Sequence, residues 1–337
     1  MPLIAHKNLP SFAKLHEEGF IVQKPQHMPE EYIPELHIGL LNMMPDKALK
    51  ATEQQFFRLL GASNLIAQFY IHPFSLPELA READAQAYIA EYYDDFENIK
   101  ANGLDALIVT GANVTQSRLE DQPFWMPLQK ILDWASSNVT STICSCLATQ
   151  AYMQSKHNIT RKLLSKKLTG IYKNRVIDRL HPLVRGINTM FDVPHSRSYS
   201  ISEKQFSHAG MRIVVQGKES GVSIATTADG FRMICFQGHP EYDTISLMKE
   251  FVRDLKLFHS GALQTPPAYP EHYFGDKIRD ILSQNPTPDQ IESLTAHYLD
   301  NTWCDSAKSI ITNWIRNVYQ LTHIENKKKI YGGVSAK

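Results

Sequence analysis

The sequence predicts an α/β fold in which a mostly parallel sheet is flanked by helices. Short apolar runs alternate with helical stretches between residues 37 and 154, an alternation typical of parallel sheets. The chain has 337 residues, of which 43% are hydrophobic and 21% charged, as in an ordinary globular protein. In such sheets ligands bind outside the carboxyl ends of the strands, so these ends are where a site is expected.

Each element is predicted from its own pattern. Buried strands are expected at His37–Leu41, Leu65–Ile71, Ala106–Thr110 and Val139–Cys144. The helices expected to cover them are Lys47–Leu60, Ala87–Ala101, Trp125–Ser137 and Leu147–Gln154. Farther on, glycine-containing turns join Arg212–Val215, Val222–Thr226 and Arg232–Phe236, which predicts antiparallel strands. Two amphipathic helices, Thr244–Leu257 and Ser306–Tyr319, complete the prediction.

The pattern divides the chain into three segments. Residues 1–35 are proline-rich and are expected to form an irregular N-terminal arm packed on the core. Residues 36–262 form the α/β core. Residues 263–337 are expected to be a C-terminal extension packed on the core, and the prolines within 264–300 favour a linker with surface additions ahead of the last helix.

Composition excludes several classes of partner. Lys and Arg (35) balance Asp and Glu (35), so the chain carries no net positive charge that would attract nucleic acid or a membrane surface. No apolar run approaches the roughly 20 residues of a membrane helix, and the N-terminus lacks a signal-peptide layout. Four cysteines are too few for a disulfide scaffold, which favours reduced thiols in the cytoplasm. The spacing of Cys144 and Cys146 is weak as a metal signal, and no metal site is expected.

The segment from Thr142 to Gln150 places a thiol at the turn between a strand and a helix. A side chain at such a turn is pushed out of the sheet, as in nucleophile elbows. The helix that follows directs its amides and positive dipole end toward the sulfur, which favours the nucleophilic thiolate. A buried structural cysteine is the alternative, and spacing alone does not choose between Cys144 and Cys146.

A second strand end supplies a base. The run Gln237-Gly238-His239-Pro240-Glu241 follows a predicted strand. Pro240 stiffens the turn, so the Glu241 carboxylate can meet the His239 imidazole and fix its tautomer. A histidine beside a proline is often only structural, but a thiol and a His-Pro-Glu turn at two strand ends together favour nucleophilic catalysis.

Several ordered motifs carry a family resemblance over roughly residues 35 to 320. They are Leu41-Asn42-Met43-Met44-Pro45-Asp46-Lys47, Thr52-Glu53-Gln54-Gln55-Phe56, Ile108-Val109-Thr110-Gly111-Ala112, Cys146-Leu147-Ala148-Thr149-Gln150-Ala151, Lys167-Leu168-Thr169-Gly170-Ile171-Tyr172, Pro194-His195-Ser196-Arg197, Gly238-His239-Pro240-Glu241-Tyr242-Asp243, and Thr312-Asn313-Trp314-Ile315 with Val318-Tyr319-Gln320. With them the chain resembles the homoserine O-succinyltransferase family, which has a class I glutamine amidotransferase-like, flavodoxin-like three-layer fold.

The resemblance implies specific roles. It selects Cys146 as the thioester-forming residue, His239 as the base and Glu241 as its partner. It assigns Lys167, Ser196 and Arg253 to the amino-acid substrate; a guanidinium can grip a carboxylate with two contacts. Backbone amides of Leu147 and of the Gly111 loop, at Ala112 or Asn113, would hold an oxyanion. Lys47 is a weaker assignment, to the phosphates of coenzyme A.

Some positions depart from the family pattern. The usual Gly-Ala-Pro is Gly111-Ala112-Asn113 here, and the tryptophan that commonly follows the cysteine is Leu147. At the position linked to acyl-donor choice the family has Gly with succinyl-CoA and Glu with acetyl-CoA, whereas this chain has Thr115. Threonine is neutral and smaller than glutamate, so it favours a succinyl group.

The resemblance therefore implies ping-pong acyl transfer from acyl-CoA to L-homoserine in methionine biosynthesis, in a cytoplasmic homodimer without a permanently bound cofactor. An acetyl donor, serine as acceptor, a cysteine hydrolase or amidase of the same fold, and a binding protein that has lost catalysis are the alternatives.

Overall fold

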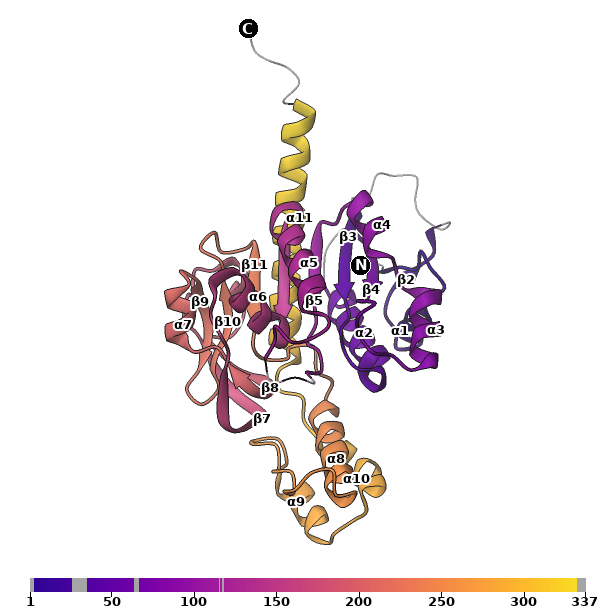
Figure 1. The fold of residues 1–337 in the computed structure, drawn as a ribbon, viewed down its shortest axis with the longest axis vertical. Helices are drawn as coiled ribbons and strands as arrows, with labels where there is room; N and C mark the ends of the chain where they lie inside the picture. The colour runs from indigo at the N-terminus through magenta and orange to yellow at the C-terminus, as the bar shows by residue number, and fades with distance from the viewer. Residues whose placement is uncertain (1–2, 26–34, 64–66, 115, 117, 332–337) are drawn as a thin grey trace.

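The computed structural model describes residues 3–25, 35–63, 67–114, 116 and 118–331, with the backbone alone given for 323–331. Within these residues one sheet of 11 strands runs through the whole fold (Figure 1). Its strands, in chain order, are β1 (Leu3–Ile4), β2 (Val22–Gln23), β3 (Glu35–Leu41), β4 (Gln68–Phe74), β5 (Ala106–Val109), β6 (Ser141–Ser145), β7 (Lys162–Val176), β8 (Met190–Ser200), β9 (Arg212–Gly217), β10 (Gly221–Thr226) and β11 (Met233–Phe236).

The sheet has a parallel half and an antiparallel half. Its spatial order is β2-β1-β4-β3-β5-β6-β11-β10-β9-β7-β8. Neighbours from β2 to β11 pair in parallel, and those from β11 to β8 pair antiparallel. The predicted mostly parallel sheet with helices, and the antiparallel strands near its end, are confirmed. The long β7–β8 hairpin is an element that the sequence pattern did not reveal.

Helices cover both faces of the sheet. They are α1 (Pro10–Glu17), α2 (Asp46–Gly61), α3 (Ala83–Tyr92), α4 (Phe96–Asn102), α5 (Trp125–Asn138), α6 (Leu147–His157), α7 (Glu203–His208), α8 (Ser246–His259), α9 (Asp276–Ser283), α10 (Pro288–Thr295) and α11 (Cys304–Tyr331), with short 3₁₀ turns at Pro182–Val184 and Ala296–Tyr298.

Alternate residues of the central strands face two separate cores. On β5, Ile108 joins the core under α2 and α11, whereas Leu107 and Val109 join the core under α5 and α6. This period of two is what a strand buried on both faces requires. A third apolar cluster lies under α8, α9 and α10, which gather below the sheet in Figure 1.

Three predictions about local structure are wrong. The N-terminal arm is not irregular, because β1, α1 and β2 form there and β1 extends the sheet edge beside β4. The single helix predicted at Ala87–Ala101 is two helices, and Asp95 starts the second by accepting hydrogen bonds from the amides of Glu97 and Asn98. The segment 264–300, predicted as a linker with surface additions, contains the helices α9 and α10. Pro288 lies in the first turn of α10, and the other prolines lie outside both helices.

Other elements appear close to the expected positions. The strand predicted at Leu65–Ile71 is β4, which begins at Gln68; residues 65 and 66 lie outside the described part of the chain. The last predicted helix, Ser306–Tyr319, lies mostly in the N-terminal half of α11, which continues to Tyr331. Trp314 anchors that helix, because its ring is fully buried and its Nε1 donates a hydrogen bond of 2.8 Å to Ser141 Oγ at the start of β6. Among the described helices, none combines the length and apolarity needed to span a bilayer.

Candidate active site

Cys146 lies in a strained turn between β6 and α6. Its φ of 53° and ψ of −107° are rare for any residue other than glycine, and such strain costs on the order of 1–3 kcal/mol. Neighbouring contacts enforce the turn: the Cys146 amide donates to Phe236 O at 2.7 Å, and Thr149 Oγ1 donates to Cys144 O at 2.6 Å. The thiol is therefore presented at the N-terminus of α6, while Cys144 is fully buried in the sheet.

The loop after β5 packs directly against this turn. A Cβ added at Gly111 would lie 3.7 Å from Cys146 Cβ and 4.0 Å from the Leu147 amide nitrogen. These are ordinary van der Waals distances, so the loop backbone lies beside the thiol and the first amide of α6. Ala112 is half-buried and Asn113 exposed in the same loop, while Thr115 lies outside the described residues.

His239 follows β11, the strand beside β6. The glycine before it allows close packing, because a Cβ on Gly238 would lie 2.4 Å from Val193 Cγ1. The His239 amide donates to Pro194 O at 2.8 Å, which fixes the turn to β8. The Nδ1 atom of His239 lies 2.7 Å from Glu241 Oε1, and both side chains are buried. This is the base-and-orienter contact that the His-Pro-Glu run predicts.

The second ring nitrogen of His239, Nε2, is buried and makes no well-formed hydrogen bond within the described part of the chain. Cys146 is near enough to influence the protonation of the ring. Burial alone would lower the pKa of His239. The negative charges of Glu241 and of the Cys146 thiolate outweigh burial and raise the pKa well above its usual value. The site therefore favours a protonated imidazole at His239.

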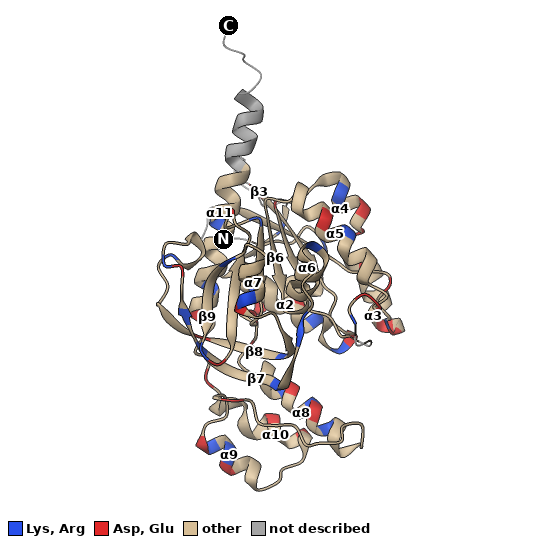
Figure 2. Cartoon of the chain, turned by 60° about the vertical axis from the view of Figure 1, so that its left-hand side comes forward, with Lys and Arg blue, Asp and Glu red and all other residues tan. Residues whose placement is uncertain are grey.

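The three side chains assigned to the amino-acid substrate meet on two carboxylates of α8. Lys167 on β7 has its Nζ 3.0 Å from Asp254 Oδ2 and 3.7 Å from Glu250 Oε2. Ser196 on β8 donates to Glu250, and Arg253 Nε donates to Asp254 Oδ1 at 2.8 Å. Figure 2 shows basic and acidic residues interspersed along α8 beside the end of β7. We call these five residues the polar cluster.

Tyr242 joins the polar cluster to the base. Its ring stacks on His239 with centroids 4.3 Å apart, and its hydroxyl donates to Glu250 Oε1 at 2.5 Å. Because Glu250 also accepts from Ser196, a continuous path of contacts runs from His239 to the residues that would hold the amino acid.

A buried cation, Arg197, contacts the segment just before His239. It donates through Nη1 to His195 Nδ1 and, at 3.1 Å, to Gln237 O. Burial lowers the pKa of Arg197 to about 10, partly offset by the Cys146 charge, so the guanidinium stays protonated at neutral pH. Positive charge near a sulfur favours its thiolate form.

Sequence reasoning missed Tyr242, Glu250, Asp254 and Arg197. Tyr242 and Arg197 stand inside quoted motifs, but only side-chain packing gives them partners. Glu250 and Asp254 are four residues apart on one helix, which places both on the same face. That spacing is the signal by which the sequence could have revealed these two carboxylates.

Lys47 is exposed in the first turn of α2, after the carboxyl end of β3, and the structure supplies no test of a role in binding coenzyme A.

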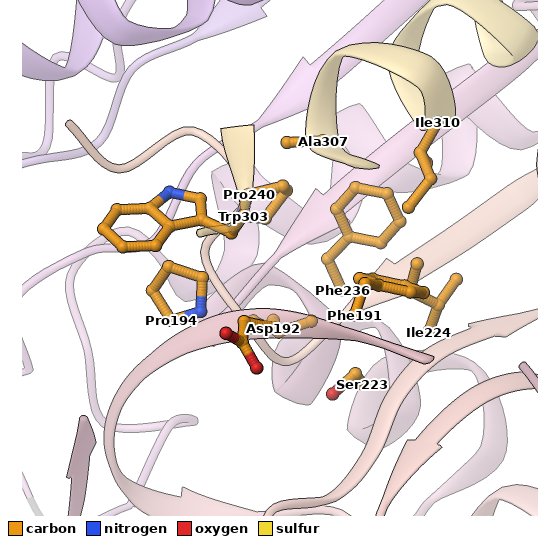
Figure 3. Close-up of a pocket in the computed structure, with 12 residues that line it drawn as sticks. Phe191, Asp192, Pro194, Ser223, Ile224, Phe236, Pro240, Trp303, Ala307 and Ile310 are labelled. Carbon is orange, nitrogen blue, oxygen red and sulfur yellow. The ribbon is translucent and has the colours of Figure 1, made fainter. Parts of the chain in front are cut away.

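A small apolar cavity lies beside the His239 loop (Figure 3). Its lining includes Phe236 and Pro240, from either side of His239 in the chain, and Trp303, Ala307 and Ile310 from the region of α11. Trp303 is almost fully buried, and its Nε1 donates to Tyr242 O at 2.9 Å. The cavity's nearly apolar lining could not orient an amino acid, so we interpret this region as packing that supports the loop.

Comparison with known proteins places the chain among relatives of one kind. A family model described as homoserine O-succinyltransferase matches residues 2–324. The homoserine O-succinyltransferase of Nitrosococcus oceani is 51% identical, over 97% of this chain and 95% of the relative. That of Allochromatium vinosum is 49% identical, over 99% of this chain and 97% of the relative.

A solved structure shares the fold at low sequence identity. The crystal structure of a putative GMP synthase subunit from Thermoplasma acidophilum is 10% identical, with a TM-score of 0.50, and the match covers 88% of this chain and 100% of that one. This likeness concerns the fold alone. The family match over nearly the whole length, and identities near 50%, show that the chain belongs to the homoserine O-succinyltransferase family.

Proposed function

We propose that this protein transfers a succinyl group from succinyl-CoA to the hydroxyl of L-homoserine through a thioester on Cys146. The observation that carries the proposal is the strained Cys146 turn beside the buried His239–Glu241 pair, in a chain of this family. The family's name supports both the donor and the acceptor.

In the first half-reaction the Cys146 thiolate attacks the thioester carbonyl. The amide of Leu147 and an amide of the Gly111 loop hold the oxyanion that forms. The C–S bond to coenzyme A then breaks, and protonated His239 gives its proton to the leaving thiolate. Cys146 is left as a neutral thioester and His239 as a neutral imidazole.

Acylation prepares the second half-reaction. The thiolate charge is one of the causes of the raised pKa of His239, and it disappears when the sulfur is acylated. The pKa of His239 then falls, so its neutral form can take the proton of the homoserine hydroxyl. The alkoxide attacks the thioester, the C–S bond breaks, and the thiolate–imidazolium pair is restored.

The polar cluster supplies the groups that an amino acid needs. Arg253 and Lys167 carry the positive charge that a substrate carboxylate requires, and Ser196 can donate and accept hydrogen bonds. Glu250 and Asp254 provide negative charge for the ammonium group. We propose that homoserine enters here with its hydroxyl toward His239. Thr115 stands at the position linked to donor choice. Because its side chain is neutral, it would not repel the carboxylate of a succinyl group.

Mass spectrometry with succinyl-CoA and no acceptor tests the covalent step. A succinyl adduct on Cys146 is expected, and it should disappear on adding homoserine. Full turnover by the Cys146→Ala variant would rule out the thioester. Rapid release of coenzyme A without an acceptor would instead indicate a hydrolase.

A substrate matrix tests specificity. Succinyl-CoA and acetyl-CoA are combined with homoserine and serine, and free coenzyme A is measured. We expect the pair of succinyl-CoA and homoserine to have the highest kcat/KM. A preference for acetyl-CoA would contradict the proposed donor, and a preference for serine the proposed acceptor.

We also propose a compartment and an oligomeric state for the protein. A coenzyme A thioester and a reactive reduced thiol both suit the cytoplasm, where we place the protein. We propose a homodimer, which sedimentation equilibrium at micromolar concentration would detect as twice the chain mass.

A further inference from the structure

Three side chains far apart in the sequence meet at the opposite edge of the parallel half. His6 follows β1, His72 lies on β4, and Asp94 stands between α3 and α4. Each offers a metal-ligating atom, and these atoms lie within 4.8 Å of one another. All three residues are half-buried. Because sequence spacing does not connect them, only the fold reveals the group.

His6 presents a nitrogen that the protein leaves unused. Its Nδ1 lies 3.1 Å from Ile4 O, so that nitrogen carries the proton and donates it to the carbonyl. Nε2 then carries a lone pair, and it is buried without a hydrogen-bond partner in the part of the chain that the structure describes. A buried nitrogen without a partner is energetically unfavourable, and a bound cation would satisfy it.

His72 is held in a comparable way. Its Nε2 lies 3.0 Å from His37 Nδ1, and its Nδ1 lies 3.1 Å from Asp94 Oδ2. A histidine that binds metal through one nitrogen usually donates the other N–H to a neighbouring acceptor. Ile4 O and His37 Nδ1 can be those acceptors for the two imidazoles.

We propose that His6, His72 and Asp94 form a structural site for a divalent transition-metal ion, with Zn²⁺ the best match to two imidazoles and a carboxylate. The ion would replace the His72–Asp94 hydrogen bond, with water completing its coordination. It would tie the segment after β1 to β4 and thus fix the sheet edge. Lys7 holds the other oxygen of Asp94 at 2.6 Å, leaving Oδ2 for the ion.

The test uses full-length, tag-free protein that has been dialysed against a chelator. Cys146 is first alkylated with iodoacetamide, so that the reactive thiol takes up no metal. Zn²⁺ binding is measured by equilibrium dialysis with elemental analysis, and Co²⁺ is added as a visible-absorption probe. We expect one equivalent of Zn²⁺ at micromolar concentration, d–d bands typical of imidazole coordination, and a higher Tm with Zn²⁺.

Variants locate the ion. His6→Gln and His72→Gln are each expected to weaken Zn²⁺ binding by at least about tenfold, because each removes one of three protein ligands. His16→Gln, which changes an exposed histidine on α1, should bind as the wild type does. If the wild-type protein bound no Zn²⁺ at 100 µM, the proposal would be overturned. This measurement does not depend on whether the variants fold. Equal affinity in all the variants would overturn it as well.

Discussion

At the scale of single residues, Glu241 acts on the proton of His239. Burial lowers the pKa of His239, but the Glu241 carboxylate at Nδ1 raises it. In Glu241→Gln the pKa of His239 should fall, so His239 holds a proton less well beside Cys146. We expect iodoacetamide alkylation of Cys146 at pH 7 to slow about tenfold for each unit by which that pKa falls.

The pH profile of alkylation, followed by intact mass, measures this shift. In the wild type the thiolate should persist to lower pH than in Glu241→Gln. Glu292→Gln, an exposed change on α10, is the control. Coincident profiles for Glu241→Gln and wild type would show that Glu241 does not support the ion pair.

Glu250 separates substrate binding from acylation. Glu250→Gln removes the charge that faces Lys167 and weakens the hydrogen bonds from Ser196 and Tyr242. We expect the KM for homoserine to rise about tenfold, since a charge-assisted contact contributes about 1.5 kcal/mol or more. The rate at which succinyl-CoA acylates Cys146 should change little. Stopped-flow acylation together with steady-state KM values distinguishes the two effects, and a slow acylation step with unchanged KM would contradict the assignment.

The backbone at Cys146 gives a prediction about stability. Glycine adopts a positive φ freely, whereas alanine does not. Cys146→Gly should therefore be more stable than Cys146→Ala, by about 1 kcal/mol. Urea unfolding of the two inactive variants measures the difference. If Cys146→Ala were the more stable, the turn would not be strained by its side chain.

At the scale of elements, α11 supports the His239 loop from behind. Trp303, just before α11, packs on Pro240 and donates to Tyr242 O. Trp303→Phe keeps an aromatic ring but leaves that carbonyl without its donor. We expect kcat to fall several-fold as His239 loses its fixed orientation, with KM for succinyl-CoA nearly unchanged. Trp134→Phe on α5 is the matched control, and an equal effect there would assign the loss to general stability.

The elements also show what local pattern can and cannot reveal. The strands β3, β5, β6 and β11 were predictable, because short buried runs followed by a turn are local signals. The β7–β8 hairpin was not, since β7 is largely exposed along its first half and alternates poorly. The helices in 264–300 were hidden because prolines at helix starts resemble prolines in a linker.

At the scale of the whole molecule, short motifs indicate one part of the candidate site, whereas the other part depends on contacts between distant segments. The thiol elbow and the His-Pro-Glu turn could be recognised because each is a short motif at a strand end. The polar cluster needed the fold, because β7, β8 and α8 bring Lys167, Ser196 and Glu250 together from distant parts of the chain. For the same reason no sequence spacing pointed to the group formed by His6, His72 and Asp94.

The junction between β6 and β11 has a consequence for how the enzyme is made. Cys146 and His239 stand about 90 residues apart along the chain, and they meet only when β11 closes onto β6. Pairings between such distant segments form late during refolding, after local helices. After dilution from denaturant, the alkylation rate of Cys146 should therefore recover more slowly than the circular-dichroism signal of the helices. The reactivity of Cys146 would then report when the sheet is complete.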